Sequence, residues 1–231
     1  MDKNFEDFFA IIIGINDYGN TQLNTLDLAR KDATDLHEFL IKTGGYKKAN
    51  TVLLVDEKAT KANINYHLEQ LKVKFTARST LVFYFSGHGS NAGNNYLLPL
   101  YNYDIEDRQS YYELQELIAL FSEINVDKLL FMFDTCYSGI LTKAKDVLEE
   151  NPDQKESQEL LLEKLVETDI HNSRVLIASS LPDQTSYEIR NANIVNGEFT
   201  HCLLNGLKGA CQIEKNKQKK EAFCLLIFCF F

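Results

Sequence analysis

Five short apolar runs constrain the fold of this chain more than any other feature of its sequence. They are Phe9–Ile15, Thr51–Val55, Thr80–Phe85, Lys128–Phe133 and Arg174–Ser179. Each has the length of a strand, and each is continuously apolar rather than alternating, which is typical of strands buried on both faces. Helix-like stretches separate the runs. Such alternation predicts an α/β fold, in which right-handed crossovers give a mainly parallel sheet with helices on both faces.

The stretch "LARKDATDLHEFLIKTGG" shows the helical pattern most clearly. Leu28, Leu36, Phe39 and Leu40 share one face, and the two glycines that follow predict the end of the helix. "KATKANINYHLEQLKVKF" and "SYYELQELIALFSEI" repeat the pattern. We therefore expect helices in each of these three stretches.

The length of 231 residues suits one α/β domain, which we expect over 1–231. Segment 143–172 interrupts the alternation, because it is densely charged and carries Pro152 near its middle. It is interpreted either as one or two solvated helices or as a mobile insertion open to proteolysis. The apolar end "AFCLLIFCFF" is about half the length of a membrane helix. A final core strand is favoured over an anchor for a membrane or a partner, or an altered chain end.

Net charge and cysteine content limit the partners and the cellular compartment that we expect. A net charge of −9 argues against nucleic acid and anionic membrane as partners, and it is compatible with basic peptides or proteins. The five cysteines have no zinc-ligand spacing, and no signal peptide pattern opens the chain. We therefore expect a cytoplasmic protein with free thiols.

His88 and Cys136 each follow one of the apolar runs, in "TLVFYFSGHGS" and "KLLFMFDTCYSG". Carboxyl ends of parallel strands meet at one edge of a sheet, so neighbouring strands would bring the imidazole and the thiol together. An imidazole that takes the thiol proton makes the cysteine a nucleophile. A lone cysteine after a strand is more often an inert buried residue, and a lone histidine between glycines is similarly ambiguous, but the pair at strand ends favours catalysis. The adjacent glycines let backbone amides point at an oxyanion.

These paired motifs resemble those of the caspase-fold cysteine peptidases (peptidase C14), and most closely those of metacaspases and bacterial caspase-like proteases. "IIIGINDY", "LDLARKDATDLHEFL" and "LIASSLPDQTSYE" resemble the first strand, the first helix and the late substrate-binding loop of that family. The resemblance implies a caspase-like α/β/α sandwich. It also implies that His88 is the general base and acid, that Cys136 is the nucleophile, and that the amides of Gly89 and Cys136 form the oxyanion hole.

The same resemblance implies a pocket for the substrate side chain before the cleaved bond, called P1. Asp32 matches an acidic pocket residue of metacaspases and Ser86 a pocket-lining serine, while Asp134 replaces the glutamine of aspartate-cutting caspases. Glu188 stands where the family has a substrate-binding arginine, and both Glu188 and Asp183 are weaker candidates, because loops shift register easily. Carboxylates at Asp32 and Asp134 would pair with guanidinium or ammonium, which predicts cleavage after Arg or Lys. From the residues alone, Asp32 is equally a solvated helix residue and Asp134 a helix cap.

The position of segment 143–172 matches the linker that caspases cut on activation. It offers lysines as cleavage points for a basic-P1 enzyme, so self-cleavage is a hypothesis; these are Lys143, Lys145, Lys155 and Lys164. Many metacaspases need calcium, held by an acidic cluster after the histidine strand. Here Asp104, Glu106 and Asp107 are tightly bunched among amides, so we expect no cofactor, although calcium activation stays open.

Two other classes of function stay open. One is a catalytically silent caspase-like module that regulates a partner, against which the presence of both His88 and Cys136 speaks. The other is a different thiol enzyme, but "CYSGILT" lacks the arginine of a phosphatase and the second cysteine of a disulfide oxidoreductase. We expect a protein or peptide substrate with a basic P1 residue, and a monomer, as is common among metacaspase-like members.

Overall fold

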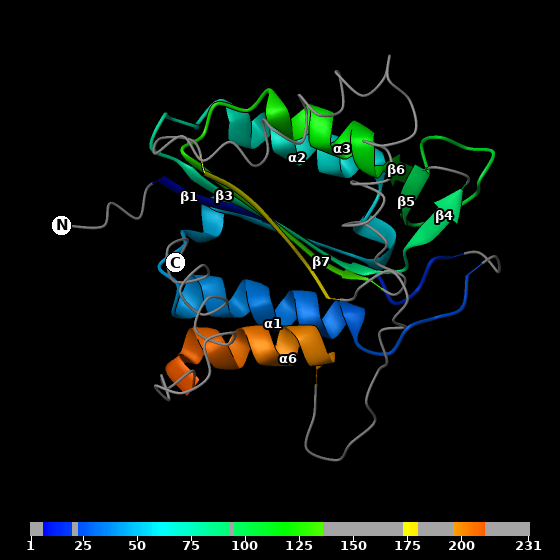
Figure 1. The fold of residues 1–231 in the computed structure, drawn as a ribbon, viewed down its shortest axis with the longest axis horizontal. Coiled ribbons are helices and arrows are strands. Elements are labelled where there is room, and N and C mark those ends of the chain that lie inside the picture. The colour runs from blue at the N-terminus through cyan, green and yellow to red at the C-terminus, as the bar shows by residue number, and fades with distance from the viewer. Residues whose placement is uncertain (1–6, 20–22, 93–94, 136–172, 180–195, 211–231) are drawn as a thin grey trace, which may run out of the picture.

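A five-stranded parallel sheet forms the centre of the structure, which is a computed structural model (Figure 1). The model describes residues 7–19, 23–92, 95–135, 173–179 and 196–210. The strands, in their order across the sheet, are β2 (Thr51–Val55), β1 (Phe8–Gly14), β3 (Thr80–Gly87), β7 (Lys128–Thr135) and β8 (Ser173–Ala178). All four pairings are parallel. The predicted fold class is therefore confirmed.

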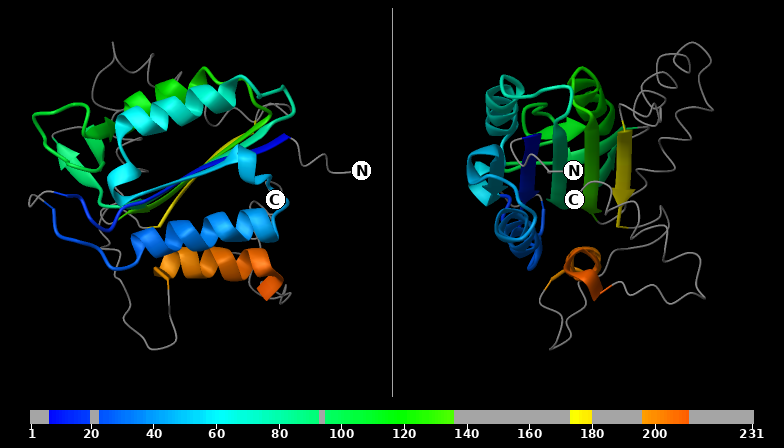
Figure 2. Two further views of the ribbon diagram at one scale, coloured as in Figure 1. Left: turned by 180° about the vertical axis from the view of Figure 1, so that it is seen from behind. Right: turned by 90° about the vertical axis from the view of Figure 1, so that its left-hand side faces the viewer.

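Helices cover both faces of this sheet (Figure 2). On one face lie α1 (Ala29–Lys42) and α6 (Glu198–Asn205), and on the other lie α2 (Lys61–Lys72) and α3 (Leu114–Ser122). The three predicted helices correspond to α1, α2 and α3. Among the residues that the structure describes, the other helical turns are η2 (Lys48–Asn50), η3 (Asp56–Lys58) and η4 (Gly206–Ala210). Helix α1 ends before Gly45, whose φ of 78° lies in the left-handed region that favours glycine.

The continuous apolar runs are explained by a core on each side of the sheet. All eight residues of β3 are buried, and they alternate between the two faces. Phe83 packs against Phe121 of α3 and Phe131 of β7, with ring centroids 5.0 and 5.9 Å away. On the other face, Tyr84 and Met132 belong to the cluster that includes residues of α1 and α6. Burial on both faces removes the polar alternation of a one-sided strand.

Strands β3 and β7 end together, and both extend two residues beyond the apolar runs. Ser86 pairs with Gly14 of β1 and with Asp134 of β7, and Gly87 pairs with Thr135. The order β2-β1-β3 places the topological switch between β1 and β3, where α/β sheets bind ligands at the carboxyl ends of their strands. We therefore expect the functional site at the loops after β1, β3 and β7.

A small antiparallel sheet lies at this end of the molecule, formed by β4 (Ser90–Ala92), β5 (Asn95–Pro99) and β6 (Tyr111–Glu113) (Figure 1). The Tyr96 hydroxyl of β5 is 2.8 Å from the Thr135 hydroxyl, which links the small sheet to the end of β7. In the portions of the chain that are described, no helix is long and apolar enough to cross a membrane. Segment 143–172 and the possible last strand at 222–231 lie outside the described residues.

Candidate active site

The two residues predicted to perform catalysis directly follow neighbouring strands in the sequence. The final pair of the β3–β7 ladder is Gly87 with Thr135, and the next residues in the sequence are His88 and Cys136. Cys136 lies outside the described residues, as do Asp183 and Glu188 of the predicted substrate loop. The strand adjacency that the predicted dyad requires is present.

The imidazole of His88 is held by the loop after β1. Its Nε2 lies 2.7 Å from the carbonyl oxygen of Asn24, and a carbonyl only accepts hydrogen bonds, so Nε2 carries a proton. In the neutral ring, Nδ1 is then the basic nitrogen. The backbone N–H of His88 donates to the Tyr18 hydroxyl at 2.7 Å, and the two rings are 5.2 Å apart. These contacts fix both the tautomer and the position of the His88 imidazole.

A buried aspartate anchors the loop that contains Tyr18 and Asn24. Asp56, at the end of β2, accepts hydrogen bonds from the backbone amides of Asn16 and Asp17 at 2.8 and 3.1 Å. Its carboxylate also pairs with Arg30 at 3.1 Å. The φ of Asp56 is 45°, so this residue keeps a left-handed backbone while its side chain reaches the loop. The support for His88 therefore extends to β2 and α1.

Asp32 and Asp134 come from different elements and meet at the start of α6. Asp32 lies on α1 and is only 2% exposed, whereas Asp134 lies in β7 and is half-buried. A Cβ atom at Gly197 would lie 2.8 Å from Oδ2 of Asp32 and 3.3 Å from Oδ2 of Asp134. Both carboxylates therefore adjoin the same glycine. We call Asp32, Asp134 and the residues that bond them the acidic cluster.

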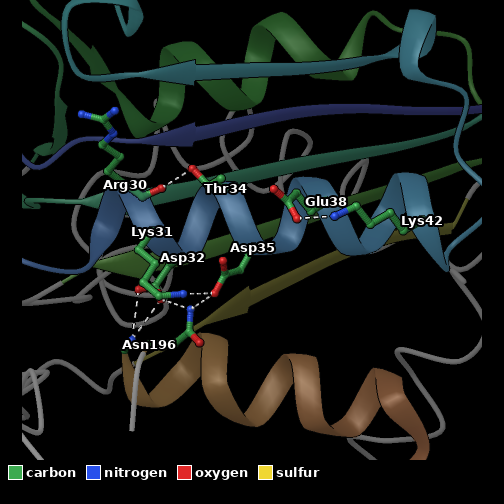
Figure 3. Close-up of polar contacts among 9 residues, drawn as sticks. Arg30, Lys31, Asp32, Thr34, Asp35, Glu38, Lys42 and Asn196 are labelled. Atoms are coloured by element: carbon green, nitrogen blue, oxygen red, sulfur yellow. Dashed lines mark hydrogen bonds and ion pairs between the residues drawn. The ribbon is translucent and has the colours of Figure 1, made fainter.

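The Asp32 carboxylate receives its hydrogen bonds from the residues that precede α6. The Asn196 side-chain amide donates to Oδ1 at 2.9 Å, and the Gly197 amide donates to Oδ1 and Oδ2 at 3.0 and 3.2 Å. Asn196 also donates to Asp35 at 2.8 Å, and Asp35 pairs with Lys31 (Figure 3). Burial raises the pKa of Asp32 from 3.8 to about 7, the Asn196 bond opposes the rise, and Asp134 adds to it.

Asp134 is bonded by a buried residue of α6. The Thr200 hydroxyl donates to Oδ2 of Asp134 at 3.0 Å and lies 2.6 Å from the Tyr84 hydroxyl. Burial raises the pKa of Tyr84 well above its ordinary value, the two aspartates raise it further, and hydrogen bonds with Thr200 and Ser86 oppose the rise. Ser86, which is 3% exposed, thus lies beside Tyr84 on the same face of β3. The three predicted pocket residues therefore lie near one another.

The solvated alternative for Asp32 is wrong, because its side chain is buried. Asp134 lies within β7, and the helix that it would cap in the other alternative falls outside the described residues. The sequence reasoning missed Asn196, Gly197 and Thr200, because nothing local in "NGEFTHCLL" indicates contact with α1 or β7. No contact with the acidic cluster was predicted for Tyr84, because in the sequence it is one of several large side chains in an apolar run.

Two of the acidic residues between β5 and β6 accept hydrogen bonds from the backbone of their own loop. Asp104 accepts the backbone N–H of Glu106 at 3.0 Å, and Asp107 accepts that of Gln109 at 2.9 Å. Across the ranges that the structure describes, no group of three or more histidines, cysteines, aspartates or glutamates is arranged to hold a metal ion. Asp104 and Asp107 thus stabilise turns.

This chain resembles a known protein family in sequence and a solved structure in fold. A family model described as the caspase domain, of peptidase family C14, matches residues 7–222. The crystal structure of protein GSU0716 from Geobacter sulfurreducens is similar with a TM-score of 0.57 at 18% identity, over 89% of this chain and 83% of that one. The structure of pro-sf-caspase-1 gives 0.48 at 15% identity, over 89% and 74%. No curated protein matches in sequence.

Proposed function

Since the chain belongs to the caspase-domain family of cysteine peptidases, we propose that it is a cysteine endopeptidase that cleaves after Arg or Lys through a His88–Cys136 dyad. The observation that carries the proposal is the common end of β3 and β7, where Gly87 pairs with Thr135 directly before the two dyad residues. The hydrogen bond from His88 to the Asn24 carbonyl supports it, because it leaves Nδ1 as the nitrogen that can accept a proton.

Each proposed step uses these groups. His88 takes the proton of the Cys136 thiol, and the thiolate attacks the scissile carbonyl carbon to form a C–S bond. The amides of Gly89 and Cys136 stabilise the oxyanion. His88 then gives its proton to the leaving amine as the C–N bond breaks. Water, deprotonated by His88, attacks the thioester, and cleavage of the C–S bond releases the acid and restores the thiol.

The preference for a basic P1 residue is supported by the acidic cluster. Asp32 and Asp134 adjoin one glycine beside the β3–β7 edge, and Ser86 pairs in register with Asp134. A guanidinium or ammonium group beside Asp32 favours the ionised form of its carboxyl. The two carboxyls therefore favour a basic side chain over an acidic one. We assign Asp32, Ser86 and Asp134 to the P1 pocket of a monomeric, single-domain enzyme that acts on proteins or peptides without a cofactor.

A panel of fluorogenic peptides with Arg, Lys or Asp at P1 tests the proposal. Wild type should cleave the Arg and Lys peptides, and Cys136→Ala and His88→Ala should each abolish turnover. Cys202→Ala is the matched control, because Cys202 is an exposed free cysteine on α6. Turnover of the Asp peptide alone would refute the assigned specificity, and silence towards every peptide, with and without calcium, would favour the silent regulatory module.

Self-cleavage within segment 143–172 belongs to the same proposal. Purified wild type should produce fragments that end at one or more of its lysines, whereas Cys136→Ala should stay intact. Mass spectrometry of the fragments locates the cut. Fragments that form equally in Cys136→Ala would show that another protease makes them.

A further inference from the structure

A chain of three buried or half-buried hydroxyl and carboxyl groups links the sheet, α6 and the acidic cluster. Tyr84 of β3 and Thr200 of α6 are both fully buried, and their hydroxyl oxygens are 2.6 Å apart. The Thr200 hydroxyl is also 3.0 Å from Oδ2 of Asp134. The contacts connect positions 66 and 116 residues apart in the sequence.

Proton counting fixes the direction of this chain. A threonine hydroxyl has one proton, and a carboxylate oxygen only accepts, so Thr200 donates to Asp134. The contact between the two hydroxyls then requires Tyr84 to donate to Thr200. Burial keeps the Tyr84 phenol protonated, as the rise in its pKa indicates. The chain therefore runs from Tyr84 through Thr200 to Oδ2 of Asp134.

The surroundings of Asp134 explain why such a donor matters. Asp134 lies close to the buried carboxyl of Asp32, and two neighbouring carboxyls disfavour each other's charge. A hydrogen bond to the charged form of Asp134 counteracts this repulsion and fixes the rotation of the carboxylate. A carboxylate held in place binds a cation with less ordering cost.

We infer that the Thr200 hydroxyl is a specificity-determining positioning group, which holds the carboxylate of Asp134 oriented for a cationic P1 side chain. The inference rests on the proposed function and extends it, because it makes α6 a third element of the P1 pocket beside α1 and β7. Thr200 acts through Asp134 and does not itself take part in bond breaking.

The test compares Thr200→Val with Thr200→Ser. Valine keeps the branched shape and removes the hydroxyl, whereas serine keeps the hydroxyl. The readout is the ratio of kcat/KM for a peptide with Arg at P1 to that for the same peptide with citrulline, the uncharged isostere. Thr34→Val is the matched control, because its hydroxyl bonds only the backbone of α1 at Arg30.

Thr200→Val should lower the Arg-to-citrulline ratio about tenfold, near the low end of what a hydrogen bond to a charged group contributes. Thr200→Ser and Thr34→Val should stay within about twofold of wild type. Tyr84→Phe should lower the ratio by about threefold. Thr200 then loses the hydrogen bond that it accepts from Tyr84 but keeps the one that it donates to Asp134. If Thr200→Val does not fold, the Arg-to-citrulline ratio of Tyr84→Phe serves as the test instead.

Three outcomes would overturn the inference. They are an unchanged ratio in Thr200→Val, an equal loss in the valine and serine variants, and, where the valine variant does not fold, an unchanged ratio in Tyr84→Phe. A wild type that cleaves neither Arg nor Lys peptides is a different failure, because it refutes the proposed function itself. The Arg-to-citrulline ratio of an active wild type keeps the two failures apart.

Discussion

Replacing Asp32 with asparagine should flatten the dependence of folding stability on pH. In the folded chain burial raises the pKa of Asp32 from 3.8 to about 7. Between these two pH values the folded state holds a proton that the unfolded state has released. The contribution to stability is therefore fully present below 3.8 and is lost as the pH rises through about 7.

The magnitude follows from the size of this difference. One pKa unit corresponds to about 1.4 kcal/mol, so the free energy of unfolding should fall by about 4 kcal/mol in total as the pH rises through the window. Asp32 is almost completely buried, so solvent screening reduces this figure little. Between pH 5 and pH 8 the expected fall is roughly 2 to 3 kcal/mol.

Urea unfolding of the Cys136→Ala protein at several pH values measures this fall without interference from self-cleavage. Adding Asp32→Asn should remove the fall, because an amide keeps the shape of the carboxyl and does not titrate. Asp107→Asn on the exposed loop is the matched control and should leave it unchanged. Parallel pH curves for the proteins with and without Asp32→Asn would refute the reasoning, whatever their absolute stabilities.

Two further substitutions test the support of the proposed site. Tyr18→Phe removes the hydroxyl that accepts the His88 amide, so kcat should fall about tenfold with KM within about twofold, while Tyr66→Phe on the exposed face of α2 should change neither; an unchanged kcat would contradict this role. Gly197→Ala suits the backbone, whose φ and ψ are −54° and 150°, but its Cβ would crowd both aspartates. It should lower the free energy of unfolding by about 1 to 3 kcal/mol and reduce cleavage of basic-P1 peptides. Unchanged values of both would show that the acidic cluster rearranges around the added methyl group at little cost.

The central sheet was predictable because burial on both faces gives each strand a continuous apolar run. The ends of β3 and β7 were predicted two residues short, since Ser86, Gly87, Asp134 and Thr135 join the ladder through backbone pairing that apolarity does not reveal. The small sheet was missed for a related reason. Its strands β4 and β6 have three residues each, which is too short for a recognisable period.

The parts of the candidate site differ in how far the sequence reveals them. His88 was predictable because a strand leads directly into it, and Asp32 and Ser86 came from the family resemblance. The tautomer of His88 depends on a carbonyl 64 residues away, and the bonds to Asp32 come from positions 164 and 165 residues away. The contact of His88 joins the loops after β1 and β3, and the bonds to Asp32 follow from the packing of α6 on α1; no local pattern encodes either.

The contribution of α6 sets a limit on how far this protein can be trimmed. A fragment that stopped at β8 would keep all five strands of the central sheet, yet the carboxyl of Asp32 would lose the donors at 196 and 197. The phenol of Tyr84 would lose the hydroxyl at 200 at the same time. A shortened version for crystallisation or screening must therefore retain the sequence through Asn205, even though α6 itself lies outside the sheet.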